Sequence, residues 1–166
     1  DLCTLPILDN LVSAGIDVFK IEGRAKGPEY VYTVTKTYRT AIDLIEKNEF
    51  TSKEKLKLTK KLEKVFNRGF TDNFYLGVPT NDSWTKYYGS TAKEKKEFVG
   101  RVTHFYDKIS VAAIIVEQNS FNKGDKMVFI GKTTGYHEEK KIKNILLEGK
   151  KVKIANKGDE ISIKVS

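Results

Sequence analysis

Three charged side chains, Lys20, Glu22 and Arg24, occupy alternate positions in the segment FKIEGRAKGPEYV. In an extended chain, alternate side chains point to the same side, so these three charges share one face. Such a face can bind an anionic or carbonyl-bearing substrate, which makes the three residues our candidate catalytic group. The alternative is a structural ion pair that orients the loop after them. The residue types alone leave both interpretations open.

The remaining residues with catalytic or metal-binding chemistry are few. Cys3 is the single cysteine, so it forms no internal disulfide, and the common role of such a residue is that of a small buried hydrophobe. His104 and His137 lie far apart in the sequence without a companion cysteine, which favours surface or strand-packing roles over metal binding. No serine stands in a G-x-S-x-G context, so the sequence does not predict a serine hydrolase.

The basic residues form a third group of candidate functional residues. The chain carries 30 Lys+Arg against 22 Asp+Glu, a formal net charge of +8, and the basic excess per residue is larger after residue 97. A basic cluster can follow an RNA backbone, because neutralising phosphates requires cations rather than a fixed code. The alternative is a solvated face that protects strand edges. The candidate RNA-binding residues are Lys140, Lys141, Lys143, Lys150, Lys151 and Lys153.

Helical periodicity organises residues 1–66, where we place the first domain. An apolar helical pattern ends at Gly15, and a short strand is predicted over 17–22. A second helix is predicted from Pro28 to about residue 47, since proline suits a first helical position. A third helix opens with the capping-box sequence Thr51-Ser52-Lys53-Glu54 and carries apolar residues as far as Phe66.

The second half of the chain has a different sequence pattern. Residues 67–97 are rich in Gly, Pro, Asn and aromatic residues without a period, which predicts an irregular connector. Residues 98–166 contain about six short alternating segments separated by turn sequences, among them two NKGD turns, which predicts a small six-stranded antiparallel β-barrel. The predicted strands cover 98–106, 110–117, 126–131, 137–148, 150–155 and 160–166.

The strand predicted at 17–22 has no partner of its own type in the chain. A lone parallel strand between helices leaves its backbone groups unpaired at both edges. We therefore expect residues 1–66 to be the truncated end of a β/α barrel whose earlier strands lie upstream of Asp1, or to pair by self-association through the exposed strand. In such barrels, charged residues at the C-terminal end of a strand face the active-site mouth, which is where Glu22 and Arg24 fall.

The segments DLCTLPILDNLVSAGIDVFKIEGRAKGPEYVYTVTKTYRTAID, FNRGFTDNFYLG and FVGRV resemble the C-terminal portion of the peptidase U32 family, the collagenase-like proteases. The resemblance implies a catalytic β/α barrel followed by a C-terminal β-barrel similar to the second domain of Tu-type elongation factors, an overall α+β protein. Asn73 stands where the family usually has glycine. Asn is the next-best residue for a left-handed conformation after glycine.

The resemblance also implies two parent activities. One is RNA modification, specifically hydroxylation of the wobble uridine of tRNA, and the other is proteolysis. It further implies an iron–sulfur cluster in some full-length members, in which a cysteine equivalent to Cys3 is one of four ligands. A cluster needs about four thiolates, and this chain has one, so we expect no cofactor in the fragment.

We therefore expect a chain that is non-catalytic by itself, with a β-barrel that binds or orients tRNA, another RNA or, alternatively, a protein substrate. A third interpretation is an oligomerisation module. No apolar run approaches the roughly 20 residues of a membrane span, and the first residues lack the layout of a signal peptide. We therefore expect a cytoplasmic location and no membrane partner.

Overall fold

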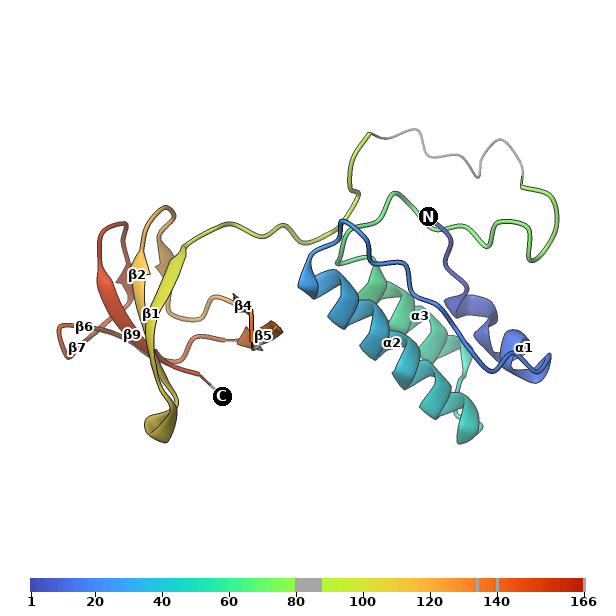
Figure 1. Ribbon diagram of the computed structural model, residues 1–166, viewed down its shortest axis with the longest axis horizontal. Coiled ribbons are helices and arrows are strands. Elements are labelled where there is room, and N and C mark those ends of the chain that lie inside the picture. Colours follow the sequence, from blue (N-terminus) through green and yellow to red (C-terminus); the bar gives the residue numbers. More distant parts are fainter. Residues whose placement is uncertain (80–87, 134, 140, 166) are drawn as a thin grey trace. The chain divides into compact units, whose positions relative to one another are not determined.

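The computed structural model describes residues 1–79, 88–133, 135–139 and 141–165. The chain divides into two compact units, Asp1–Lys95 and Lys96–Ser166. The first contains the α-helices, and the second contains the strands together with one 3-10 turn, η3 (Asp107–Ile109) (Figure 1). No described helix combines the length and apolar character needed to cross a membrane.

The helical unit begins with a 3-10 turn, η1 (Leu5–Ile7), that runs directly into α1 (Leu8–Ser13). The helix ends as predicted, because Gly15 follows it with φ 83° and its N–H donates to the carbonyl of Val12 at 3.0 Å. The apolar pattern is therefore helical throughout, but Pro6 near its start accompanies a 3-10 turn rather than an α-helical one.

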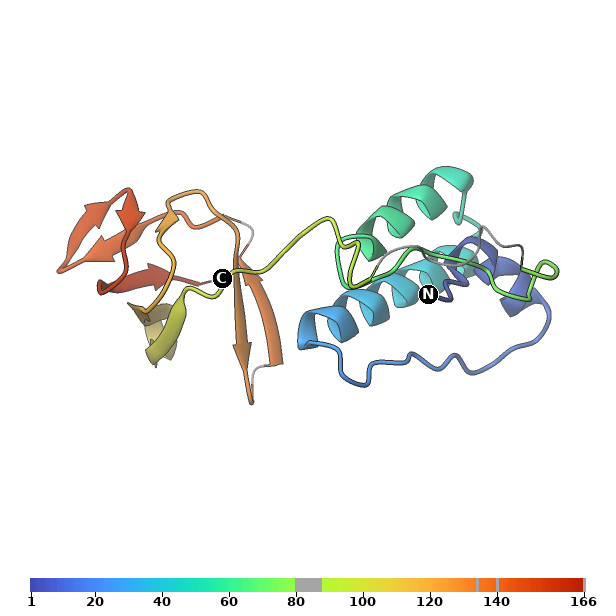
Figure 2. The same ribbon diagram turned by 90° about the horizontal axis from the view of Figure 1, so that it is seen from above.

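Two longer helices, α2 (Pro28–Glu46) and α3 (Ser52–Leu62), complete the unit and lie side by side in both ribbon views (Figures 1 and 2). Thr51 caps α3 by accepting a hydrogen bond from the Glu54 N–H at 3.4 Å. α3 ends before Phe66, so the helix is shorter than predicted. The shared core of the unit consists of Cys3, Leu5, Leu8, Val34, Ala41, Leu58 and Leu62.

The strand predicted over 17–22 is wrong: these residues pair with no strand in the described part of the chain. Burial does alternate along this segment, because Phe19 and Ile21 pack against the helical core while Val18 is 82% exposed. A strand also requires a neighbour that accepts its backbone hydrogen bonds, and no described segment supplies one. Alternate residues are buried because the extended segment lies along the helices with one side against them.

The second unit is antiparallel throughout, in agreement with the predicted strand pairing, but its strands are shorter and more numerous. A five-stranded sheet has the order β1-β2-β9-β6-β7, and the pairs β3-β8 and β4-β5 form two further sheets. The bounds are β1 Gly100–Tyr106, β2 Val111–Val116, β3 Phe121–Asn122, β4 Met127–Gly131, β5 Gly135–Glu139, β6 Ile145–Leu147, β7 Lys150–Val152, β8 Ile154–Ala155 and β9 Glu160–Lys164.

The predicted six-stranded closed barrel is therefore corrected: among the described residues the strands form three separate sheets. The segment predicted as one strand over 137–148 breaks between β5 and β6, where the buried Ile142 exchanges backbone hydrogen bonds with Gly124 and Asp125. The core lies between the sheets and consists of Ala112, Ile114, Val116, Phe121, Ile142, Ile145, Ala155, Ile161 and Ile163.

The two NKGD turns have the same local structure. In each turn the Asp carboxylate accepts a hydrogen bond from the Asn N–H, at 2.8 Å for Asn122–Asp125 and 2.7 Å for Asn156–Asp159. The glycine of each turn has a positive φ, 101° at Gly124 and 96° at residue 158. Each glycine N–H donates to the carbonyl of a buried residue on another segment. The repeated turns therefore attach distant parts of the unit to one another.

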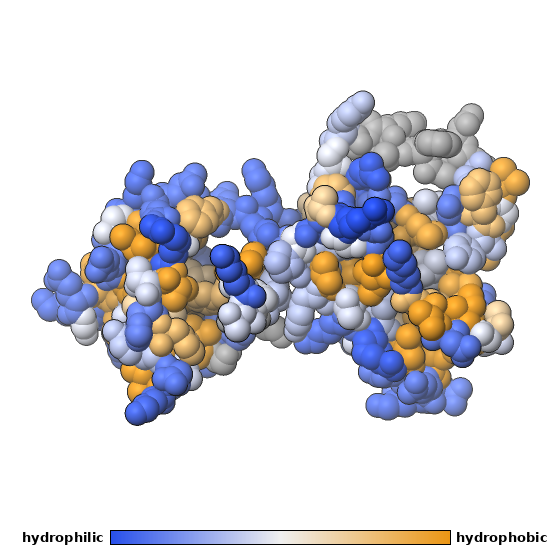
Figure 3. Space-filling model, in the orientation of Figure 1, coloured by the Kyte–Doolittle hydropathy of each residue, from blue (hydrophilic) through white to orange (hydrophobic). Residues whose placement is uncertain are grey.

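Apolar side chains also reach the surface of the helical unit, as the orange areas over it in Figure 3 show. Besides Val18, the side chains of Leu76 and Val78 are 67% and 85% exposed. An apolar surface of this kind is typical of a face that contacts another protein or domain.

Candidate functional site

The candidate catalytic group lies on the surface of the helical unit. The side chains of Lys20, Glu22 and Arg24 are all exposed. Glu22 accepts hydrogen bonds from Arg24 at its backbone N–H (2.7 Å) and at Nε (3.1 Å). These hydrogen bonds, followed by the charge of Lys20, hold the pKa of the Glu22 carboxyl below its usual value. Glu22 and Arg24 therefore form an exposed ion pair at 3.1 Å, which is compatible with both interpretations of the group.

Just beyond Arg24, Lys26 lies over the Phe66 ring, with Nζ 3.3 Å from the ring centroid. A cation over an aromatic face is attracted by the ring quadrupole. This contact ties the segment that carries Glu22 and Arg24 to the chain that follows α3. The sequence contains no local pattern that predicts it, because the two residues are 40 positions apart.

Cys3 lies in the helical core with 5% of its surface exposed. Burial raises the pKa of its thiol. The Tyr38 hydroxyl approaches the sulfur at 4.0 Å and also receives the Thr4 N–H at 3.2 Å. A buried, neutral thiol is a poor metal ligand. Among the described residues no group of three His, Cys, Asp or Glu side chains could hold a metal ion, and the single cysteine supplies one of the roughly four thiolates that an iron–sulfur cluster needs.

The ionisation of the Tyr38 hydroxyl predicts how the stability of the helical unit depends on pH. Burial, followed by the nearby Cys3, raises the pKa of Tyr38 to about 12, so the folded state favours the neutral phenol. This stabilisation is fully present below the unfolded-state pKa of about 10 and is lost as the pH rises through about 12. We expect the urea midpoint of helix unfolding to fall more between pH 9.5 and 11.5 in the native chain than in Tyr38→Phe. Equal falls would contradict the assignment, and Tyr75→Phe, at a 53% exposed position, serves as the control.

The first three residues pair with a segment nearly 70 positions later. The Cys3 N–H donates to the Thr71 carbonyl at 2.8 Å, and the Thr71 N–H donates to the Asp1 carbonyl at 3.0 Å. Arg68 adds an ion pair with the Asp1 carboxylate at 3.0 Å. The sequences DLC and RGFT are thus neighbours in space. Asn73, just beyond, has φ 54°, which lies in the left-handed region.

The buried side chain of Asn67 organises this region, and sequence reasoning missed it. Its amide Nδ2 donates to the carbonyls of Glu63 (3.2 Å) and Val65 (2.9 Å). Its Oδ1 accepts from the Gly69 N–H (3.2 Å) and the Thr91 hydroxyl (2.7 Å). One amide therefore connects the end of α3, the RGFT segment and residues 88–93. Single asparagines in irregular sequence carry no pattern that marks such a role.

The predicted RNA-binding lysines lie in the second unit. Lys141, Lys143, Lys150, Lys151 and Lys153 are exposed, and none of them has an ion-pair partner in the part of the chain that the structure describes. Lys150 and Lys151 belong to β7, and the other three lie in the connections on either side of β6 and β7. Lys140 lies outside the described residues.

The first NKGD turn adds a lysine to this group. The Lys123 N–H donates to the Lys153 carbonyl at 2.7 Å, so these two residues are neighbours. The Cε of Lys141 lies 4.0 Å from where a Cβ at Gly124 would stand. Lys123, Lys141 and Lys153 therefore surround one turn, and we call them the turn lysines. The repetition of NKGD was the sequence feature that could have indicated Lys123.

A second basic surface lies on the exposed side of α3. A shallow groove of about 440 Å³ is lined by Lys53, Leu56, Lys57, Lys60, Lys61 and Lys64. Two of these lysines form ion pairs, Lys57 with Glu54 and Lys64 with Glu94. Partial neutralisation makes this surface a weaker candidate for an anionic partner than the turn lysines.

Residues 1–85 match the family model of peptidase family U32. The match covers more than half of the 166 residues, so the chain belongs to peptidase family U32. This confirms the family resemblance found in the sequence.

Similar proteins carry two kinds of name. The chain is 39% identical over 165 residues to a Porphyromonas gingivalis protein named collagenase, covering 99% of this chain and 39% of that protein. It is 38% identical over 168 residues to an uncharacterised protease of Methanocaldococcus jannaschii, covering 100% of this chain and 40% of the relative. It is 34% identical over 135 residues to a tRNA hydroxylation protein of Bacillus subtilis, covering 79% of this chain and 31% of the relative. The chain thus spans less than half the length of each.

Among solved structures, the C-terminal domain of a Geobacillus thermoleovorans protein named for the U32 peptidases matches with a TM-score of 0.39 and 25% sequence identity. The match covers 42% of this chain and 85% of that domain.

Proposed function

We propose that this chain is the C-terminal part of a U32-family protein that modifies tRNA, and that its strand-rich unit binds the RNA. The observation that carries the proposal is that five exposed lysines of the second unit form no ion pair with a carboxylate among the described residues, namely Lys141, Lys143, Lys150, Lys151 and Lys153. Lysine side chains that form no ion pair within the protein are available to neutralise phosphates. The name of the Bacillus subtilis relative supplies the substrate class.

In the parent, we propose that Lys20, Glu22 and Arg24 face the mouth of a β/α barrel formed with upstream residues, and that the exposed apolar side chains beside them contact it. The burial of residues 18–21 supports this proposal. Phe19 and Ile21 pack against the helical core while Val18 is exposed, so the segment has a second, uncovered side on which a further layer of the barrel can pack. The strand-rich unit would then act as an accessory RNA-binding domain of the kind found in Tu-type elongation factors.

The binding test uses the 166-residue chain and unmodified tRNA at several salt concentrations. Affinity should fall with salt by a log–log slope of about −0.7 to −0.9 for each contacted phosphate. Replacing Lys123, Lys141 and Lys153 together by glutamine removes up to three contacts, so the slope should flatten by about 2 to 3. The free energy of unfolding should stay within about 0.5 kcal/mol, because all three side chains are exposed.

The matched control replaces three exposed lysines of α3, Lys53, Lys60 and Lys61, by glutamine, which removes the same charge from the other unit. Its slope should stay close to that of the native chain. An equal flattening in both variants would mean a generic effect of charge and would contradict the proposal. Undetectable binding of tRNA by the native chain at low salt would also contradict it.

The second candidate function is proteolysis, favoured by the 39% identity over nearly the whole chain to the protein named collagenase. The full-length parent distinguishes the two functions. Cleavage of gelatin without any change in tRNA would support proteolysis and overturn the RNA proposal.

A further inference from the structure

The five-stranded sheet has one face against the core and one face away from it. Burial alternates along β2, where Ala112, Ile114 and Val116 are buried and the residues between them are half-buried. The register extends this alternation across the sheet, because directly paired residues share a face. We call the side opposite Ala112, Ile114 and Val116 the outer face.

The pairings define a continuous row across the outer face. His104 on β1 pairs with Ala113 on β2, which pairs with Ser162 on β9. Ser162 pairs with Leu146 on β6, and Leu146 pairs with Lys151 on β7. Four steps of about 4.8 Å make the row about 19 Å long. An exposed ring thus stands at one end and an exposed lysine at the other.

A second, shorter row runs beside the first. Tyr106 pairs with Val111, which pairs with Lys164 on β9. Tyr106 is 48% exposed, and its ring packs edge-on against His104 with the centroids 4.4 Å apart. Neither Lys164 nor Lys151 has an ion-pair partner in the described ranges. The two rows therefore combine an aromatic pair at one edge with free cations on β9 and β7.

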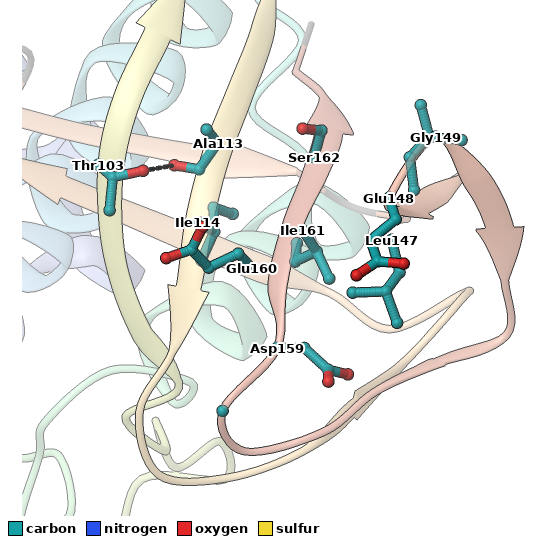
Figure 4. A pocket seen from close by; sticks show the side chains of 12 residues that line it. Thr103, Ala113, Ile114, Leu147, Glu148, Gly149, Asp159, Glu160, Ile161 and Ser162 are labelled. Atoms are coloured by element: carbon teal, nitrogen blue, oxygen red, sulfur yellow. Dashed lines mark hydrogen bonds between the residues drawn. The ribbon is translucent and has the colours of Figure 1, made fainter.

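The centre of the face is hollowed. A pocket of about 690 Å³ opens here, and Thr103, Ala113, Leu146 and Ser162 are among its lining residues. Figure 4 shows the small side chains of Ala113 and Ser162 on neighbouring strands, with the Thr103 hydroxyl directed at the Ala113 carbonyl. Small side chains leave room between the aromatic edge and the lysine edge.

Acidic residues also line the pocket. Glu148, Asp159 and Glu160 are among its lining residues, and Glu160 shares the outer face with Ser162, which stands two positions later on β9 (Figure 4). Their charges repel phosphates, which favours an RNA backbone placed toward Tyr106 and Lys164, at the opposite end of the face from Glu160. Carboxylate oxygens accept hydrogen bonds, which suits the amino groups of exposed bases rather than the backbone.

We propose that the outer face binds an unpaired segment of RNA, with bases stacked on the His104–Tyr106 pair and phosphates held by Lys164 and Lys151. This inference rests on the proposed RNA-binding function and names the kind of RNA structure recognised. Bases stack on exposed aromatic rings only where they are not already stacked in a helix, so the aromatic edge selects single strands. The lysines alone bind paired and unpaired RNA alike.

The test measures binding of the 166-residue chain to a labelled 12-nucleotide single strand and to the same sequence annealed as a duplex. Tyr106→Ala should weaken single-strand binding about tenfold and leave duplex binding within about twofold. The salt slope should not change, because no charge is removed. Tyr106→Phe should restore single-strand binding, and Lys164→Gln should flatten the slope by about 0.7.

Tyr75→Ala, which removes a 53% exposed tyrosine of the helical unit, is the matched control and should have no effect. In one outcome, replacing the turn lysines weakens binding of the single strand and of tRNA, but Tyr106→Ala and His104→Ala leave binding unchanged. In that case the aromatic inference is wrong while the proposed function stands. If no RNA binds, both are wrong. An equal loss of single-strand and duplex binding in Tyr106→Ala would mean that the sheet is damaged and would contradict selective stacking.

Discussion

Replacing Leu58 by alanine is expected to lower the free energy of unfolding of the helical unit by about 3 kcal/mol. Leu58 lies on α3 with 1% of its surface exposed and packs in the cluster that contains Leu5 and Leu62. The substitution loses the transfer free energy of the removed atoms and leaves a cavity that helices on both sides cannot fully close. Ellipticity at 222 nm during urea unfolding reports this loss, because the described α-helices lie in this unit.

The control is Leu56→Ala, two positions away on the same helix. Leu56 is 58% exposed, so its truncation removes little buried surface and should change the free energy of unfolding by about 0.5 kcal/mol or less. Both variants replace leucine by alanine in the same helix, so the change in helix propensity is the same in both and does not contribute to the difference between them. Indistinguishable midpoints for the two variants would show that α3 does not pack through Leu58.

Asn67→Ala is the second substitution expected to have a large effect, a loss of about 2 to 3 kcal/mol. Asn67 is 5% exposed, and its amide satisfies two carbonyls, one N–H and one hydroxyl. Truncation leaves these groups without their partner, and burial of an unsatisfied polar group costs more than the hydrogen bond itself contributed. Residues 88–93 keep two backbone hydrogen bonds, from the Thr91 N–H to the Asn67 carbonyl and from the Lys93 N–H to the Glu63 carbonyl, so limited proteolysis should increase only modestly there.

Two further variants isolate the role of this amide. Asn10→Ala, at an exposed position of α1, should leave stability nearly unchanged. Thr91→Val removes the hydroxyl partner alone, so its effect should be smaller than that of Asn67→Ala and not additive with it. Strict additivity would mean that the two side chains act independently, contrary to the 2.7 Å hydrogen bond between them.

Local features of the helical unit could be predicted from the sequence because short-range physics determines them. Pro28 begins α2, Thr51 caps α3 and Gly15 ends the first helix, each through a preference that needs no distant partner. The segment 17–22 could not be predicted in the same way. Its alternating burial matched a strand, but strand formation depends on a neighbour that alternation does not reveal.

In the second unit, turn sequences and alternation predicted antiparallel strands but not their closure. Whether strands form one barrel or three sheets depends on which edges meet, and the buried Ile142 together with the first NKGD turn interrupts the predicted long strand. The basic group between Lys141 and Lys153 could be predicted from the sequence. The addition of Lys123 could not, because this residue joins Lys153 through a hydrogen bond between segments 30 residues apart.

The family, the capped helix ends and the basic character of the second unit could all be predicted from the sequence, since each is encoded in residue types and short spacings. Three-dimensional packing was needed to show that Glu22 and Arg24 form an exposed ion pair and that Cys3 is buried beside Tyr38. Register likewise placed His104 in one row with Lys151, although 46 other residues separate them along the chain. Side chains far apart in sequence meet through backbone pairing, and one residue of shift would turn each of them to the opposite face.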